Sequence, residues 1–113
     1  MNNLTIKSVK ASESRLIINF KCRGQISKFF QTNQFYADYD VPIENVPEDI
    51  LVIPFLSAVL PIVWANHAVI YVNALDEKFL ESVGEYKKVL QKLFPKLSLG
   101  GRLIVKYTSK QHP

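Results

Sequence analysis

The amino-acid sequence predicts one small α/β or α+β domain, built on a mixed sheet of about five strands with two main helices. Three observations predict this class. The chain has 113 residues, which is the length of one domain. Segments with an apolar period of two, typical of strands, flank segments with a helical period. A hairpin pattern opens the chain and a strand–helix–strand pattern closes it, so both antiparallel and parallel pairing are expected.

The first part of the chain predicts three strands. Leu4–Lys10 and Arg15–Cys22 are predicted to form a hairpin, because the link between them is short and polar. The second strand has one fully apolar side, made of Leu16, Ile18, Phe20 and Cys22. This pattern predicts a sheet covered mainly on one face. A third strand is predicted near Gln34–Asp40 from its aromatic composition, and residues 41–49 are expected to be a connecting loop.

The segment Ile50–Val72 contains no Asp, Glu, Lys or Arg. Its length would suffice for a membrane span, but two prolines and the polar pair Asn66-His67 interrupt it. We therefore predict a buried helix over Pro54–Ala65 and a strand over Ala68–Asn73. Asn66 is expected to take the left-handed conformation that ends the helix. A helix of this length is about 18 Å long, too short to cross a bilayer.

The last third of the chain predicts an amphipathic helix and a final strand. Asp76 is the expected N-cap. Apolar residues then recur at spacings of three and four from Phe79 to Phe94, which places them on one helix face. Pro95 is expected to stop the helix. Arg102–Thr108 alternates as a strand, so this region has the length of a parallel βαβ unit. The predicted order is β-β-β-α-β-α-β.

Charge is distributed unevenly along the chain, whose net charge is +4. Residues 1–37 carry six basic groups and one acidic group, residues 38–49 carry five acidic groups and no basic one, and residues 87–113 carry seven basic groups and no acidic one. The basic regions are either solvated faces or phosphate-binding surfaces. The single cysteine, Cys22, permits no intramolecular disulfide and favours a reducing compartment, so a cytoplasmic protein is expected.

No complete catalytic, cofactor-binding or metal site is predicted. His67 has no clustered ligand nearby in sequence and fits a structural role at a helix end. Cys22 lies on an apolar strand face without activating neighbours. Residues 38–49 have two prolines and no glycine, unlike the known calcium loop. Gly100-Gly101 precedes a strand, whereas phosphate loops open a helix. We therefore expect no enzymatic activity from this chain alone.

The predicted apolar helix has almost no polar face. A helix that is apolar all round is buried on all sides, and one small sheet is expected to cover a single side. We therefore predict an interface with a partner, formed by Phe55, Leu56, Val59, Leu60, Val63 and Trp64. The alternative is that the C-terminal helix and the segment Ile26–Phe30 cover the helix within the chain.

A longer pattern extends over residues 46–107. It comprises VPEDILVIPFL from Val46, the segments Val59–Ile62 and Ile70–Val72, and Leu75–Phe79. The pattern resembles the N-terminal region of bacterial proteins related to PP-loop ATP pyrophosphatases, the adenine-nucleotide alpha-hydrolase-like group. The resemblance implies the N-terminal module of a longer protein, docked on a nucleotide-binding domain that binds ATP. The family's phosphate loop, of the type Ser-Gly-Gly-x-Asp-Ser, does not occur here, so the resemblance assigns no catalytic residue.

Two functions are therefore expected from the sequence. The first is a non-catalytic accessory domain that docks through residues 50–64 on a PP-loop-type domain, in cis or in trans, or on a second copy. The alternative is a stand-alone nucleic-acid-binding module that uses the basic residues of 15–28 and 87–110, with Phe29, Phe30 or Tyr36 for base stacking. Salt distinguishes them, because nucleic-acid binding weakens steeply as salt rises.

Overall fold

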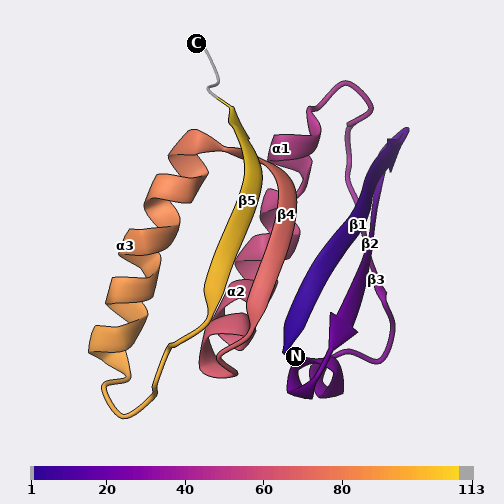
Figure 1. The fold of residues 1–113 in the computed structure, drawn as a ribbon. Helices are drawn as coiled ribbons and strands as arrows, with labels where there is room; N and C mark the ends of the chain where they lie inside the picture. The colour runs from indigo at the N-terminus through magenta and orange to yellow at the C-terminus, as the bar shows by residue number, and fades with distance from the viewer. Residues whose placement is uncertain (1, 110–113) are drawn as a thin grey trace.

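The computed structural model describes residues 2–109 and confirms the predicted α/β class with a mixed five-stranded sheet (Figure 1). The elements in chain order are β1 (Asn3–Ser12), β2 (Arg15–Arg23), the 3-10 helix η1 (Gln25–Phe29), β3 (Gln34–Asp38), α1 (Glu48–Leu51), α2 (Ile53–Ala65), β4 (Val69–Asp76), α3 (Glu77–Leu93) and β5 (Arg102–Ser109).

The sheet has the strand order β3-β2-β1-β4-β5. The pairs β1–β2 and β2–β3 are antiparallel, whereas β1–β4 and β4–β5 are parallel, so the predicted hairpin and the predicted parallel unit are both present. Strands β1 and β4 join the two halves through only three pairs, from Asn3–Val69 to Thr5–Tyr71. Beyond these pairs the two strands diverge, as Figure 1 shows.

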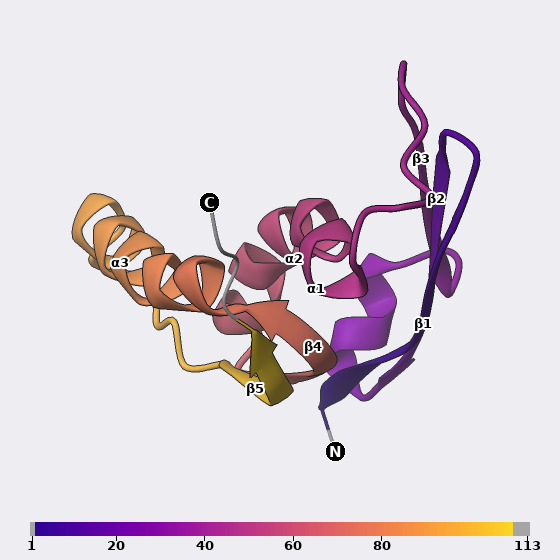
Figure 2. The ribbon, with the colours of Figure 1, turned by 90° about the horizontal axis from the view of Figure 1, so that it is seen from above.

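Both long helices lie on the same side of the sheet. Figure 2 shows that β4 and β5 lie beneath α2, that β1, β2 and β3 rise along one flank of it, and that α3 lies along the other flank. A β-bulge between Ile6 and Ser8 in β1 increases the local bend and twist of the sheet. The curled sheet therefore covers more than one side of α2.

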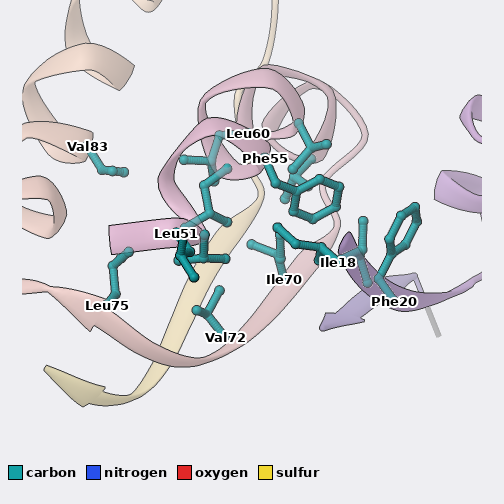
Figure 3. Close-up of a cluster of buried hydrophobic side chains, with 14 of the residues drawn as sticks. Ile18, Phe20, Leu51, Phe55, Leu60, Ile70, Val72, Leu75 and Val83 are labelled. Carbon is teal, nitrogen blue, oxygen red and sulfur yellow. The ribbon is translucent and has the colours of Figure 1, made fainter. Parts of the chain in front are cut away.

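The six residues predicted to form a partner interface lie in the core of the chain. Phe55, Leu56, Val59, Leu60, Val63 and Trp64 are each at most 4% exposed. The ring of Phe55 packs between those of Phe20 and Phe35, at centroid distances of 5.0 and 5.3 Å. On the other flank Tyr86 of α3 meets Trp64 edge to face at 5.7 Å. Figure 3 shows the cluster that α2 forms with the strands. The expectation that the sheet covers only one side is corrected, because the sheet curls around the helix.

The structure differs from two local expectations and confirms a third. Residues 48–51 form the short helix α1, so the predicted loop is shorter than expected. Asn66 is not left-handed: its φ is −96°, and His67 takes the positive φ of 55° instead. Asn66 is the C-cap of α2, and its N–H and its side-chain Nδ2 both donate to the carbonyl of Ile62. The predicted cap is confirmed, since the Asp76 carboxylate accepts from the Phe79 N–H at 3.1 Å.

Within residues 2–109, every helix is too short or too polar to cross a membrane.

Candidate nucleic-acid interface

The sheet face turned away from α2 and α3 is the candidate site, and we call it the open face. Strand partners share a face, so the register assigns its side chains. They are Asn3, Thr5, Ser8 and Lys10 of β1, Arg15, Ile17, Asn19, Lys21 and Arg23 of β2, Gln34, Tyr36 and Asp38 of β3, Val69, Tyr71 and Asn73 of β4, and Arg102, Ile104 and Lys106 of β5. In the view of Figure 2, α2 and α3 both lie on the opposite side of the sheet.

Tyr71 lies on this face in β4, the strand between the central strand β1 and the edge strand β5. The register places it between Thr5 of β1 and Ile104 of β5, and Thr5 in turn pairs with Lys21 of β2. The exposed fraction of Tyr71 is 37%, so the residue is partly accessible to solvent. One row towards the start of β4 lie Arg23 and Arg102, and one row towards its end lies Lys106. Four long cationic side chains thus stand in the row of Tyr71 or in the rows on either side of it.

Two hollows open along β4, and Tyr71 lines the larger of them. The larger has a volume of about 400 Å³ and is lined by Thr5, Ile6, Tyr71, Val72, Asn73, Ile104 and Lys106. The smaller, of about 200 Å³, lies where β1 and β4 diverge and is lined by Ile6–Val9, Glu48, Val52 and Val72–Ala74. Ile6, Val72 and Asn73 line both. Asn73 donates to the Glu48 carboxylate at 3.0 Å, so α1 fixes the orientation of this amide.

Polar contacts connect the open-face side chains of β1, β2 and β3. Gln34 donates to Asn19, and Asn19 donates to Ser8, each at 3.0 Å, so one row of hydrogen bonds crosses β3, β2 and β1. Arg15 binds Asp38 with N–O distances of 2.7 and 3.2 Å and lies 5.7 Å from the centre of the Tyr36 ring. The hydrogen bond from Arg15 lowers the pKa of the Asp38 carboxyl. This carboxylate therefore stays charged and paired at neutral pH.

The other charged residues that the register assigns to the open face are all positive, and the Glu48 carboxylate lies at its edge against Asn73. The exposed cations of this face besides Arg15 are Lys10, Lys21, Arg23, Arg102 and Lys106. Ion pairs between described side chains join Arg15 to Asp38 and Lys88 to Glu85, so these five cations have no carboxylate partner within residues 2–109. A surface with five uncompensated cations attracts anions over a distance of about 10 Å at moderate salt.

The structure divides the basic residues predicted to bind nucleic acid into two groups. Lys21 and Arg23 of the first basic region share the open face with Arg102 and Lys106 of the second. The lysines of α3 do not belong to this face. Among the predicted stacking residues, Tyr36 lies on the open face, whereas Phe30 packs edge to face on Phe20 at 5.3 Å and belongs to the core side.

Sequence reasoning missed Tyr71, because it treated the whole segment around it as a buried strand. A signal was present in the alternation of β4, where Ile70 and Val72 are buried and Tyr71 and Asn73 are exposed. A strand that alternates in this way has one face towards solvent. The uncharged character of the segment concealed that alternation, since tyrosine and asparagine carry no charge.

The other candidate residues stay separate in space. Cys22 is half-buried on the core side of β2, and burial raises the pKa of its thiol, which disfavours the reactive thiolate. His67 is an exposed helix-end residue. Among residues 2–109, no three side chains of His, Cys, Asp or Glu are grouped as metal ligands.

Comparison of the chain with models of known protein families, with curated proteins and with solved structures gave no match. The resemblance to the PP-loop group therefore stays a prediction.

Proposed function

We propose that this domain binds single-stranded nucleic acid across the open face of its sheet. The supporting observation is the placement of Tyr71 among Lys21, Arg23, Arg102 and Lys106, four cations without a carboxylate partner within residues 2–109. The phosphates of the nucleic-acid strand pair with these cations, and an unstacked base packs on the ring of Tyr71. The hollow beside Tyr71 gives such a base room on the sheet surface.

The architecture of the sheet also favours a ligand on this face. Parallel strands are usually covered on both faces, yet β4 and β5 have helices on one face only within the described chain. Tyr71 of β4 and Ile104 of the edge strand β5 are consequently left partly exposed. A ligand with flat rings and a negatively charged backbone can pack on these apolar side chains and bind the cations of the open face.

The test is fluorescence anisotropy with a labelled oligothymidylate of 12 nucleotides. We expect Tyr71→Ala to weaken binding about tenfold, because stacking of one base on an aromatic ring contributes about 1–3 kcal/mol. If about four phosphates are neutralised, raising salt from 50 to 200 mM weakens binding by about 50-fold. Lys21→Gln and Lys106→Gln should each reduce that salt dependence.

Matched controls use residues that are not assigned to the open face. Lys78→Gln removes the same charge from the exposed first turn of α3, and Tyr39→Ala removes a partly exposed tyrosine next to β3. Both should bind like the wild type. Absence of binding at 50 mM salt, or an equal loss in Lys78→Gln and Lys106→Gln, would overturn the proposal.

A cytoplasmic location accords with this function, because the single thiol of Cys22 suits a reducing compartment that also contains nucleic acid. Docking on a nucleotide-binding domain stays a prediction from the resemblance. Such docking would need a surface other than the six buried residues of α2, since those side chains already fill the core.

A further inference from the structure

The C-terminal end of α3 carries an exposed apolar tip that has no role in the proposed nucleic-acid binding. We define the α3 tip as Tyr86, Val89, Leu93, Phe94 and Leu97, whose exposed fractions lie between 42 and 66%. Tyr86, Val89 and Leu93 recur at helical spacing and form an apolar stripe on α3, and Phe94 and Leu97 follow it in the turn after the helix. α3 buries fully only Val83, nearer its start.

The tip projects from the body of the domain. Figure 1 shows the end of α3 and the following turn at the lower left, beyond the sheet, and Figure 2 shows α3 on the outer flank of α2. A projecting apolar surface of five large side chains is unusual for a monomer in water, and such patches mark interaction sites.

The charge around the tip indicates its partner. Lys88, Lys92 and Lys96 are exposed at the same end of α3 and in the turn after it, Lys88 in an ion pair with Glu85 at 3.4 Å, and no Asp or Glu follows Glu85 in the sequence. A second copy placed against this surface would bring two basic rims together. An anionic lipid surface instead attracts the lysines and accepts a projecting set of leucine and aromatic side chains.

We propose that the α3 tip is a peripheral membrane contact that inserts Leu93, Phe94 and Leu97 into the headgroup region of an anionic bilayer while Lys88, Lys92 and Lys96 bind lipid headgroups. This inference does not depend on nucleic-acid binding, because the open face and the tip use different side chains. The projecting end of α3 allows contact with a bilayer without any change in the core.

The experiment is co-sedimentation of the whole chain with vesicles of phosphatidylcholine alone and of phosphatidylcholine with 30% phosphatidylserine, a composition chosen as roughly physiological for an anionic surface. We expect binding to the anionic vesicles that is at least about tenfold stronger than to the neutral ones. Leu93→Ser combined with Phe94→Ser should lower it at least about tenfold, as should Lys92→Gln combined with Lys96→Gln. Circular dichroism should show unchanged folding, because all four side chains are exposed.

The matched control is Lys21→Gln combined with Lys106→Gln, which removes two charges from the open face. This variant should keep vesicle binding and lose oligonucleotide binding. The proposal is overturned if wild type does not sediment with anionic vesicles, if the serine variant sediments equally well, or if the open-face variant loses vesicle binding. It is also overturned if wild type does not bind vesicles and sedimentation velocity shows that wild type is a dimer and the serine variant a monomer. A second copy is then the partner of the tip.

Discussion

The ammonium group of Lys87 donates a hydrogen bond of 2.9 Å to the carbonyl oxygen of Gly101, and thereby ties the middle of α3 to the start of β5. The same ammonium lies 5.5 Å from the centre of the Trp64 ring, on α2. One side chain therefore connects three elements on the flank where α3 covers α2.

Loss of this connection should destabilise the domain. Lys87→Met keeps most of the apolar stem but leaves the Gly101 carbonyl without its donor, so we expect the free energy of unfolding to fall by about 1 kcal/mol. Urea denaturation measures the change. Lys88→Met is the control, because Lys88 is exposed and its ion pair with Glu85 is a surface pair, worth only about 0–0.5 kcal/mol. Equal effects of the two substitutions would contradict the assigned role of Lys87.

The two adjacent glycines before β5 should respond differently to alanine. A Cβ on buried Gly101 would lie 2.6 Å from the Ala68 carbonyl oxygen and would also meet the Val63 carbonyl oxygen, and backbone atoms cannot move aside cheaply. We expect Gly101→Ala to cost about 3 kcal/mol of unfolding free energy. A Cβ on Gly100 would meet the ring of exposed His67, which can rotate into solvent. Gly100→Ala should therefore melt close to the wild type, as measured by thermal denaturation.

The core position of α2 predicts the effect of truncating it. Leu60 is fully buried, so Leu60→Ala should lower the unfolding free energy of the isolated chain by about 3 kcal/mol. Ser57→Ala, at an exposed position of the same helix, should change it by less than about 0.5 kcal/mol. Chemical denaturation of both variants checks this. If Leu60→Ala left the stability of the isolated chain unchanged, this face of α2 would not be the core, and a partner interface there would regain support.

Cys22 should react slowly with thiol reagents. Burial raises the pKa of its thiol, so at pH 8 the folded protein holds less thiolate than an unfolded chain does. We expect slower labelling by a disulfide reagent in native buffer than in denaturing urea, with the native rate increasing as the pH rises. The same shift means that the neutral thiol is favoured in the folded state. Its contribution to stability is complete below the pKa of the unfolded thiol and is lost as the pH rises through the folded value. Equal labelling rates in native buffer and urea would contradict this account.

The sequence alone determined most elements of secondary structure, because these depend on local patterns. The hairpin of β1 and β2 follows from alternating apolar residues around a short polar link. The cap at Asp76 follows from a side chain that reaches the N–H of Phe79 three residues on, and the closing parallel unit follows from one helix between two strands. Asn66 and His67 mark the limit of local reasoning, since either residue could have taken the left-handed position and a hydrogen bond to Ile62 decided the choice.

Only the tertiary structure decided which surfaces are free. The apolar residues of α2 predicted a missing partner, but the curl of the sheet and the packing of Tyr86 on Trp64 cover them within the chain. Strand pairing places Tyr71 on the open face and puts Lys21 and Lys106 on the same face from strands that are distant in sequence. Local patterns state which side chains share a face of one strand. They do not state which face the helices cover, because that depends on strand pairing and on the bend of the whole sheet.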